Sequence, residues 1–176
     1  LYPNDPAVEQ TIAGICRKRD VPLHHVDPAA LTTRIPDLQG QTFEYDGSVY
    51  RIPLTGEYQI FNAGVVLKTL EILRRRGWDI PPQKAAEGLA GTEWPARMEM
   101  LWDAPLFFLD GGHNPQCIDA LAGNLREMFP QTAMTLLLGI LGDKDYPVML
   151  EQLKEFAEQV VCVTPNSSRA LTSAEL

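Results

Sequence analysis

A polar segment that follows an apolar run contains the residues best suited to bind a ligand. It lies within LFFLDGGHNP, residues 106–115, where Asp110 ends the apolar run and His113 comes three residues later. In parallel α/β sheets, ligands bind at the carboxyl ends of the strands. A carboxylate there can accept hydrogen bonds from a ligand, and an imidazole can donate or accept them near neutral pH. Two glycines permit a tight turn, and Asn114 can cap a helix that begins at Pro115. The sequence therefore predicts a ligand-binding loop.

The same segment has a simpler explanation, in which Asp110 only caps the turn and His113 is a solvated loop residue, because Asp and Gly are common after strands. A metal site is disfavoured, since His24 and His25 are adjacent in an expected strand and would point to opposite faces. The letters GGHNPQ do not match the dinucleotide fingerprint GxGxxG, and no Ser or Cys elbow is present. Ligand binding and turn capping remain the two interpretations.

Composition and charge are those of an ordinary globular protein. The chain has 176 residues, 45% of them hydrophobic and 22% charged, and its net charge of −8 disfavours a general affinity for nucleic acid or anionic lipid. No apolar run approaches the roughly 18 residues of a membrane span. Three separated cysteines are expected to be reduced thiols: Cys16, Cys117 and Cys162. We expect a cytoplasmic monomer with no nucleic-acid or membrane partner.

Strand-like and helix-like segments alternate in the carboxyl-terminal half of the chain. The predicted strands cover residues 106–109, 134–141 and 160–164, and the predicted helices cover 115–129 and 147–159, with another helix starting near Ser173. This order is typical of a mainly parallel sheet with right-handed crossovers, a Rossmann-like α/β unit.

The amino-terminal half has a different pattern, whose middle is locally antiparallel. Asp46 and Gly47 lie inside an alternating segment, residues 42–52, and predict a hairpin. The other predicted elements are helices over 6–19, 59–76 and from Pro81-Pro82 to about Leu89, and a short strand over 21–26. The change of pattern places a domain boundary within residues 92–99.

Five segments together resemble folylpolyglutamate synthases, often bifunctional with dihydrofolate synthase, within the Mur-type ATP-dependent amide ligases. The segments that carry the resemblance are GEYQIFNA at 56–63, WPARME at 94–99, LDGGHNP at 109–115, GILGDKD at 139–145 and RAL at 169–171. Tyr58, Ala96 and Gly112 depart from the family pattern, which has His, Gly and Ala at these positions. The resemblance covers about 120 residues and corresponds to the carboxyl-terminal part of the family.

The resemblance implies an α/β fold made of two parts. Residues 1–96 would be the C-terminal part of a central ATP-binding domain, and residues 97–176 a Rossmann-like Mur ligase C-terminal (glutamate ligase) domain that is truncated. Nothing in the sequence matches the family's glycine-rich P-loop or its magnesium ligands, and the first residue is not Met. We therefore expect a fragment cut at both ends and inactive by itself.

The activity implied by the resemblance is ATP-dependent addition of L-glutamate to folate, or to dihydropteroate, through an acyl-phosphate intermediate. ATP and Mg²⁺ would be required, with the magnesium ligands mostly outside this chain. Two alternatives stay open: a Mur-type peptidoglycan amide ligase, and a non-catalytic nucleotide-binding Rossmann-like module. The paired DGGHNP and DKD motifs favour the folate branch.

The resemblance also implies which residues would contact the substrates. ATP would be bound by Gln59, Asn62, Arg97, Asp110 and His113. In this set Asn62 would meet the adenine edge and Arg97 the phosphates, while Asp110 would bind ribose hydroxyls or orient the interdomain hinge. The residues that could serve glutamate, or merely cap a strand-to-helix loop, are Asp143, Lys144, Asp145 and Arg169. No catalytic residue and no metal ligand is expected within this chain.

Overall fold

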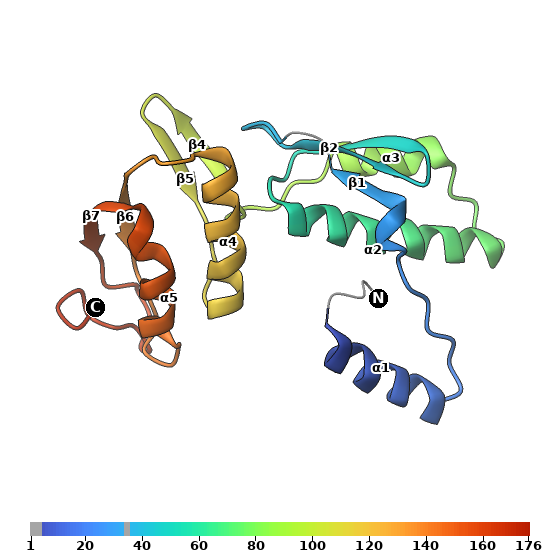
Figure 1. Cartoon of the computed structure of the whole chain (residues 1–176), viewed down its shortest axis with the longest axis horizontal. Helices are drawn as coiled ribbons and strands as arrows, with labels where there is room; N and C mark the ends of the chain where they lie inside the picture. The colour runs from blue at the N-terminus through green and yellow to red at the C-terminus, as the bar shows by residue number, and fades with distance from the viewer. Residues whose placement is uncertain (1–4, 34–35) are drawn as a thin grey trace. The chain divides into compact units, whose positions relative to one another are not determined.

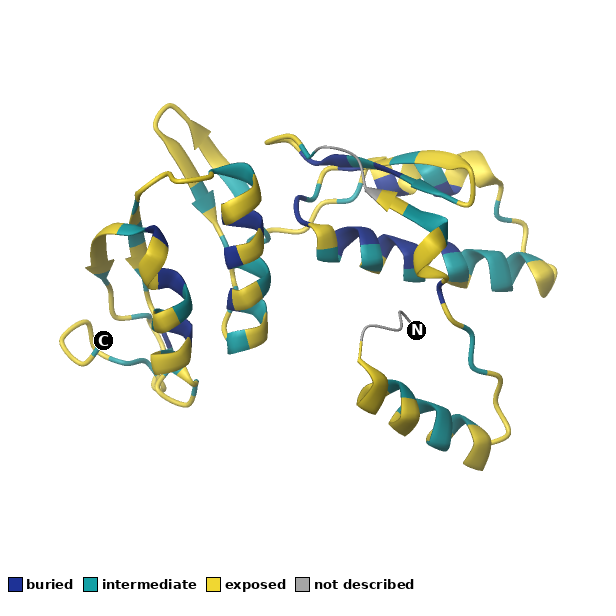
Figure 2. Ribbon diagram, in the orientation of Figure 1, coloured by how far each residue is buried: buried dark blue, intermediate teal, exposed yellow. Residues whose placement is uncertain are grey.

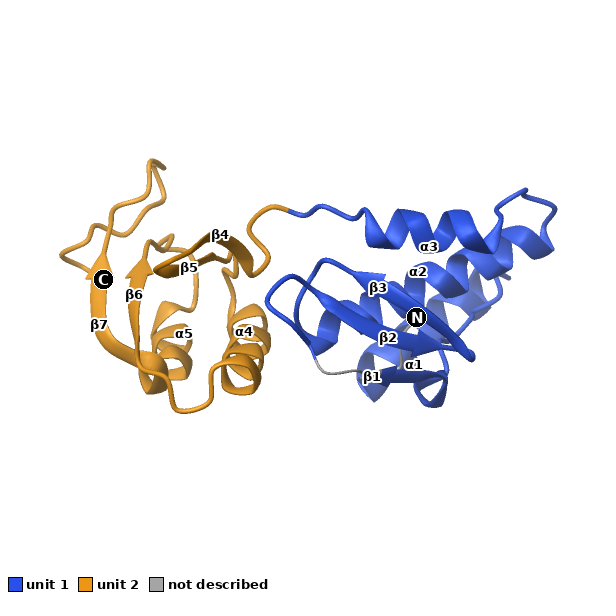
Figure 3. Ribbon diagram, turned by 90° about the horizontal axis from the view of Figure 1, so that it is seen from above, with its two compact units in different colours: residues 1–94 blue, residues 95–176 orange. Residues whose placement is uncertain are grey.

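The computed structural model describes residues 5–33 and 36–176, and the chain divides into two compact units (Figure 1; Figure 3). Unit 1 is Leu1–Trp94 and unit 2 is Pro95–Leu176. The division falls within residues 92–99, where the sequence pattern changes. Within the described residues, no helix combines the length and the apolar character that crossing a membrane requires.

Unit 1 contains a three-stranded antiparallel sheet of β1 (Leu31–Thr33), β2 (Gln41–Tyr45) and β3 (Ser48–Ile52). The predicted hairpin is confirmed, because β2 and β3 are joined by Asp46 and Gly47, both with positive φ (50° and 75°) as this turn requires.

The strand predicted over 21–26 is wrong, because this segment is irregular and the additional strand is β1. Pro22 has no N–H to donate to a neighbouring strand, and only Val26 of the segment is fully buried. Residues 21–26 therefore do not form a strand with one buried face.

Three helices complete unit 1: α1 (Pro6–Lys18), α2 (Glu57–Arg75) and α3 (Pro82–Ala90), all close to their predicted ranges. α1 begins where Asp5 accepts hydrogen bonds from the amides of Ala7 (2.8 Å) and Val8 (3.3 Å). α2 packs one face against the sheet, and its buried stretch is visible in Figure 2. The core of the unit consists of Phe43, Ile52, Ile60, Ala63, Leu67 and Leu89.

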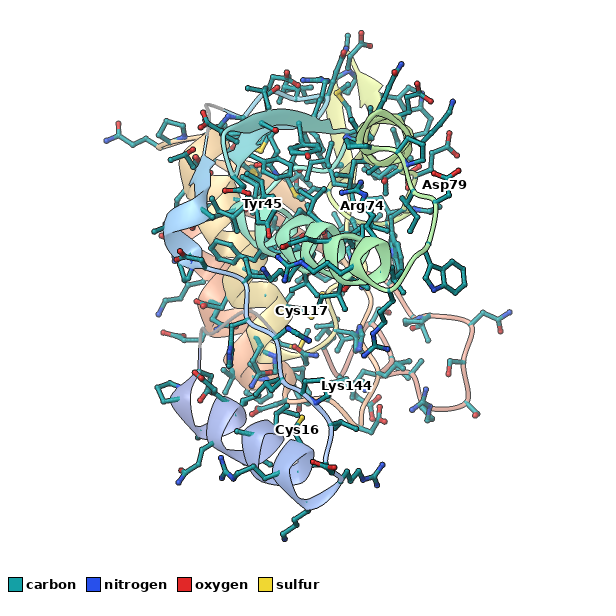
Figure 4. The ribbon with its side chains drawn as sticks, turned by 90° about the vertical axis from the view of Figure 1, so that its right-hand side faces the viewer. Cys16, Tyr45, Arg74, Asp79, Cys117 and Lys144 are labelled. Carbon is teal, nitrogen blue, oxygen red and sulfur yellow. The ribbon has the colours of Figure 1, made fainter. Side chains whose placement is uncertain are left out.

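The two ends of α2 are tied to neighbouring segments by side chains. At its start, the fully buried Gln41 donates through Nε2 to the carbonyls of Leu54 (2.8 Å) and Gly56 (2.7 Å). At its end, Arg74 Nε donates to the Ile80 carbonyl at 2.5 Å, and Figure 4 labels Arg74 beside the segment that carries Asp79. The first of these contacts fixes the turn of helix that carries Gln59 and Asn62.

Unit 2 begins with an antiparallel hairpin of β4 (Glu99–Asp103) and β5 (Leu106–Leu109). It continues through α4 (Pro115–Met128), β6 (Met134–Leu138), α5 (Tyr146–Leu153), a short 3-10 helix at Lys154–Phe156 and β7 (Ala157–Cys162). β6 and β7 pair in parallel, as predicted. The fold is therefore of the mixed α/β class that the sequence indicates.

The hairpin and the end of α5 in unit 2 differ from the predictions. Strand 106–109 pairs antiparallel with 99–103, a strand that was not predicted, rather than within the parallel pair. The helix predicted over 147–159 ends at Leu153, and β7 already begins at Ala157. The buried residues Met149, Leu153 and Phe156 keep helical spacing across the end of α5, so the apolar pattern overstates the length of the helix.

The core of unit 2 has two adjoining clusters. One contains Met98, Ala122, Leu125 and Phe156, and the other contains Ile118, Ile140, Met149 and Leu153. α4 contributes to both, so it holds the hairpin on one side and α5 on the other. The predicted helix near Ser173 is present only as a turn, in which Thr172 and Glu175 exchange the hydrogen bonds of a capping box.

Candidate nucleotide-binding site

The loop after β5 is organised by the carboxylate of Asp110, which is half-buried. Its Oδ1 accepts a hydrogen bond from the Gly112 amide at 2.7 Å, and its Oδ2 accepts one from the Met98 amide at 2.9 Å. The carboxylate therefore joins its own loop to the turn that precedes β4. Turn capping, one of the two interpretations of the motif, is a role that Asp110 fulfils.

Arg97 lies in that preceding turn, against the backbone of the DGGHNP loop. The Gly111 amide donates to the Ala96 carbonyl at 2.9 Å, and Arg97 Nη1 donates to the same carbonyl at 3.3 Å. A Cβ on Gly111 would lie 3.3 Å from Arg97 Nη1, so glycine allows the guanidinium to approach the loop closely. Within residues 5–33 and 36–176, Arg97 forms no salt bridge.

His113 is exposed at the end of the same loop. Its Nδ1 lies 3.0 Å from the Gly111 carbonyl, so Nε2 is the ring nitrogen that could contact a ligand. The following residue, Asn114, caps α4 by accepting a hydrogen bond from the Cys117 amide at 2.8 Å, and Figure 4 labels Cys117 in the first turn of this helix. The predicted helix start at Pro115 is confirmed. Arg97, Asp110 and His113 thus belong to one loop cluster of unit 2.

Gln59 and Asn62 lie in the first turns of α2, in unit 1. Asn62 is exposed and donates through Nδ2 to Oε1 of the buried Gln59 at 3.1 Å. This bond leaves the Asn62 carbonyl oxygen and one amide hydrogen available to a ligand. Asn62 is thus the contact residue of the pair and Gln59 its support.

The loop after β6 contains three of the remaining predicted site residues, Asp143, Lys144 and Asp145, and the fourth, Arg169, lies in the segment after β7. Asp143 Oδ2 and Arg169 Nη1 form an exposed ion pair at 2.8 Å, and the Gly142 amide donates to the Arg169 carbonyl at 2.7 Å. Asp145 precedes α5 but makes no side-chain capping bond. The side chain of Lys144, labelled in Figure 4, is half-buried and has no salt bridge within the described residues. Asp145 therefore does not cap α5 through its side chain, while Asp143 joins this loop to the segment after β7 through Arg169.

The chemistry available at the Arg97 cluster is anion binding. A guanidinium without an acidic partner can form charge-assisted hydrogen bonds to phosphate oxygens, and the imidazole of His113 can add another contact. Within the described residues, no group of three or more His, Cys, Asp or Glu side chains could hold a metal ion. Glu99, whose Oε2 accepts the Ala96 amide at 2.8 Å, also belongs to the cluster. It was not predicted, although it lies inside the WPARME segment.

The sequence of this chain is similar to a known protein family. Residues 96–176 match the model of the Mur ligase, glutamate ligase domain. The folylpolyglutamate synthase of Lacticaseibacillus casei is 38% identical over 142 residues, which cover 77% of this chain and 33% of that protein. The dihydrofolate synthase/folylpolyglutamate synthase of Mycobacterium tuberculosis is 34% identical over 130 residues, 71% of this chain and 27% of that protein. This chain spans about a third or less of these two relatives.

Solved structures agree with the sequence relatives. The M. tuberculosis folylpolyglutamate synthase complexed with ADP and AMPPCP superposes with a TM-score of 0.83 at 30% identity, over 95% of this chain and 39% of that one. An FPGS–AMPPCP–folate complex gives a TM-score of 0.79 at 28% identity, over 97% of this chain and 43% of that one. We conclude that residues 96–176 are a Mur ligase glutamate ligase domain, and that the chain as a whole is similar to a carboxyl-terminal part of the folylpolyglutamate synthases.

Proposed function

We propose that this chain is part of an ATP-dependent ligase that adds L-glutamate to folate, or to dihydropteroate. The observation that carries the proposal is the Arg97–Asp110–His113 cluster, an anion-binding arrangement within a glutamate ligase domain. Relatives of the same fold are complexed with ADP and AMPPCP, and one also with folate. Both the chemistry of the cluster and the ligands of the relatives support a nucleoside triphosphate as the ligand.

Each residue proposed to contact ATP would have a separate task. Arg97 would bind phosphate oxygens through its unpaired guanidinium, and His113 would add a contact through Nε2. Asp110 would hold the loop through its two backbone hydrogen bonds, in addition to any contact with the nucleotide. In unit 1, Asn62 would pair with the adenine edge, since its amide has one donor and one acceptor left, and Gln59 would fix its orientation.

The proposed reaction has two steps. A carboxylate oxygen of the folate attacks the γ-phosphorus of ATP, which gives an acyl phosphate and releases ADP. The amino nitrogen of glutamate then attacks the acyl carbon, loses a proton and displaces phosphate, so that an amide forms. This chain would contribute positioning and charge neutralisation, and none of its residues is proposed to exchange a proton or a covalent bond with the substrates.

The glutamate side would be the loop after β6. Arg169 is already paired with Asp143, so Lys144 is the cation left for a substrate carboxylate, while Asp143 and Asp145 flank it. The described residues do not fit a magnesium site, and no residue of this chain is proposed as its ligand. Residues 1–96 would form part of a central ATP-binding domain and 97–176 the glutamate ligase domain, and the 176-residue chain is expected to be inactive by itself.

An isotope-transfer experiment tests this proposal. The ligase that contains this chain would be incubated with ATP, magnesium, glutamate and tetrahydrofolate labelled with ¹⁸O in its terminal carboxyl group. We expect a product that carries one further glutamate residue, and one ¹⁸O atom in the released phosphate. Glutamylation without label in the phosphate would contradict the acyl phosphate, and glutamylation of neither tetrahydrofolate nor dihydropteroate would contradict the function.

A further inference from the structure

The turn that carries Arg97 has an uncommon backbone. Ala96 and Met98, on either side of Arg97, have φ of 55° and 46°, in the left-handed region that residues with a side chain rarely adopt. Such a conformation persists only where the surroundings impose it. The contacts that impose it therefore decide where the guanidinium of Arg97 is held.

Three hydrogen bonds and one buried side chain hold this turn. Glu99 Oε2 accepts the Ala96 amide at 2.8 Å, Asp110 Oδ2 accepts the Met98 amide at 2.9 Å, and the Gly111 amide donates to the Ala96 carbonyl at 2.9 Å. Met98 itself is 4% exposed and packs in the cluster with Ala122, Leu125 and Phe156. Met98 and Asp110 thus hold the carboxyl side of the turn, and Glu99 holds the amide at its amino side.

The strand register explains how two carboxylates reach one turn. Glu99 is the first residue of β4 and pairs with Leu109, the last residue of β5, so that Glu99 and Asp110 lie on neighbouring strand ends. Both carboxylates accept backbone amides and neither forms a salt bridge with Arg97. The guanidinium of Arg97 is consequently not paired with either carboxylate and can contact an external anion.

We propose that Glu99 is a positioning residue for Arg97, which it presents to a phosphate-bearing ligand by holding the Ala96 amide. The proposal rests on the nucleotide site proposed above. The proposal and simple electrostatics predict opposite changes in anion affinity when Glu99 is removed. Removing a carboxylate close to bound phosphates should strengthen anion binding if only charge matters. If Glu99 positions Arg97, its removal weakens binding, because the turn loses the contact that orders the cation.

Nuclear magnetic resonance on the 176-residue chain separates these possibilities. Glu99→Ala removes the acceptor, Glu99→Gln keeps a neutral acceptor, and Glu93→Ala removes an exposed carboxylate from the preceding linker as a matched control. Hydrogen exchange of the Ala96 amide and relaxation of the Arg97 backbone report the order of the turn without ligand. Titration with AMPPCP, followed by amide shifts of residues 111–114, reports nucleotide binding, and Arg97→Ala measures how far binding depends on the guanidinium.

We expect Glu99→Ala to speed exchange of the Ala96 amide and weaken AMPPCP binding by roughly two- to tenfold, the range of one hydrogen bond. Glu99→Gln should recover most of both effects, and Glu93→Ala should change neither. Unchanged exchange and order in Glu99→Ala would overturn the positioning role, as would tighter AMPPCP binding. If the turn loosens in Glu99→Ala but neither Arg97→Ala nor Glu99→Ala alters AMPPCP binding, the positioning of Arg97 stands and the nucleotide assignment of the proposed function fails.

Discussion

Asp110 and His113 are three positions apart in one loop, yet the structure gives them different roles. Both oxygens of Asp110 accept backbone amides, from Gly112 and Met98, so this side chain is part of the framework of unit 2. His113 is exposed and makes a single contact to the Gly111 carbonyl. The two residues should therefore respond differently to substitution.

We predict that Asp110→Ala lowers the free energy of unfolding by about 1–3 kcal/mol, because two backbone amides lose their acceptor. His113→Ala should change it by less than about 0.5 kcal/mol, as expected for an exposed side chain. Urea unfolding followed by circular dichroism measures both. Glu127→Ala, which removes an exposed carboxylate from α4 of the same unit, is the control. Equal stability of Asp110→Ala and the wild type would show that these hydrogen bonds contribute nothing.

At the scale of elements, the start of α2 depends on one buried amide. Gln41 of β2 is 1% exposed and donates to two carbonyls, those of Leu54 and Gly56, just before the helix begins. Because Gln59 and Asn62 follow within two turns, this contact connects the packing of the sheet to the proposed adenine contact.

We predict that Gln41→Leu destabilises unit 1 by about 2–4 kcal/mol, since a buried carbonyl and a partly buried one would lose their donor. The exposed Gln39, two residues earlier, provides the control substitution Gln39→Leu. Thermal unfolding compares the two variants with the wild type. Similar melting temperatures for Gln41→Leu and Gln39→Leu would rule out the role given to Gln41.

An ion pair on α2 should make the stability of unit 1 depend on pH. Lys68 Nζ lies 2.9 Å from Glu71 Oε2, and this hydrogen bond is the main reason that the pKa of Glu71 lies below its usual value of 4.5; Arg75 lowers it further. A lowered pKa in the folded state stabilises the protein above pH 4.5, and this contribution is lost as the pH falls through the folded-state pKa.

Glu71→Gln should accordingly cost about 0.5 kcal/mol at pH 7, the usual size for a partly exposed pair, and progressively less as the pH falls below 4.5. Urea unfolding at several pH values checks this. Glu93→Gln, which changes an exposed carboxylate of the same unit, should show no such trend. A cost for Glu71→Gln that is the same at pH 3 and pH 7 would contradict the assignment of the stabilisation to the ionised carboxylate.

The elements best predicted from sequence are those with strong local signals. Asp46-Gly47 and the Asn114 cap identified a hairpin and a helix start, because their side chains and φ angles act within a few residues. The strand at 99–103 was not predicted because its two-residue turn, Ala104-Pro105, has none of the Asn-Gly or Asp-Gly letters that identify a hairpin in sequence. The hydrogen bond from the Ala96 amide to Glu99 was not foreseen either, because it forms in a turn whose left-handed residues, Ala96 and Met98, have no sequence signal.

At the scale of the whole molecule, the net charge of −8 opposes the approach of an anionic nucleotide. A local cation without an acidic partner is therefore needed to bind phosphate, and Arg97 meets that requirement within unit 2. The other proposed nucleotide residues, Gln59 and Asn62, belong to unit 1. The proposed activity is that of a whole ligase of which this chain would be one part.

The most direct test compares Arg97→Ala with the wild type in the ligase that contains this chain, by glutamate incorporation into tetrahydrofolate at varied ATP and varied glutamate. Loss of a charge-assisted contact to phosphate should raise the KM for ATP roughly ten- to a hundredfold and leave the KM for glutamate unchanged. Arg97→Lys should recover only part, because a point charge does not reproduce the guanidinium fork. Arg76→Ala, at an exposed position after α2, is the control. An Arg97→Ala enzyme with the wild-type KM for ATP would contradict the assignment of this cluster to ATP.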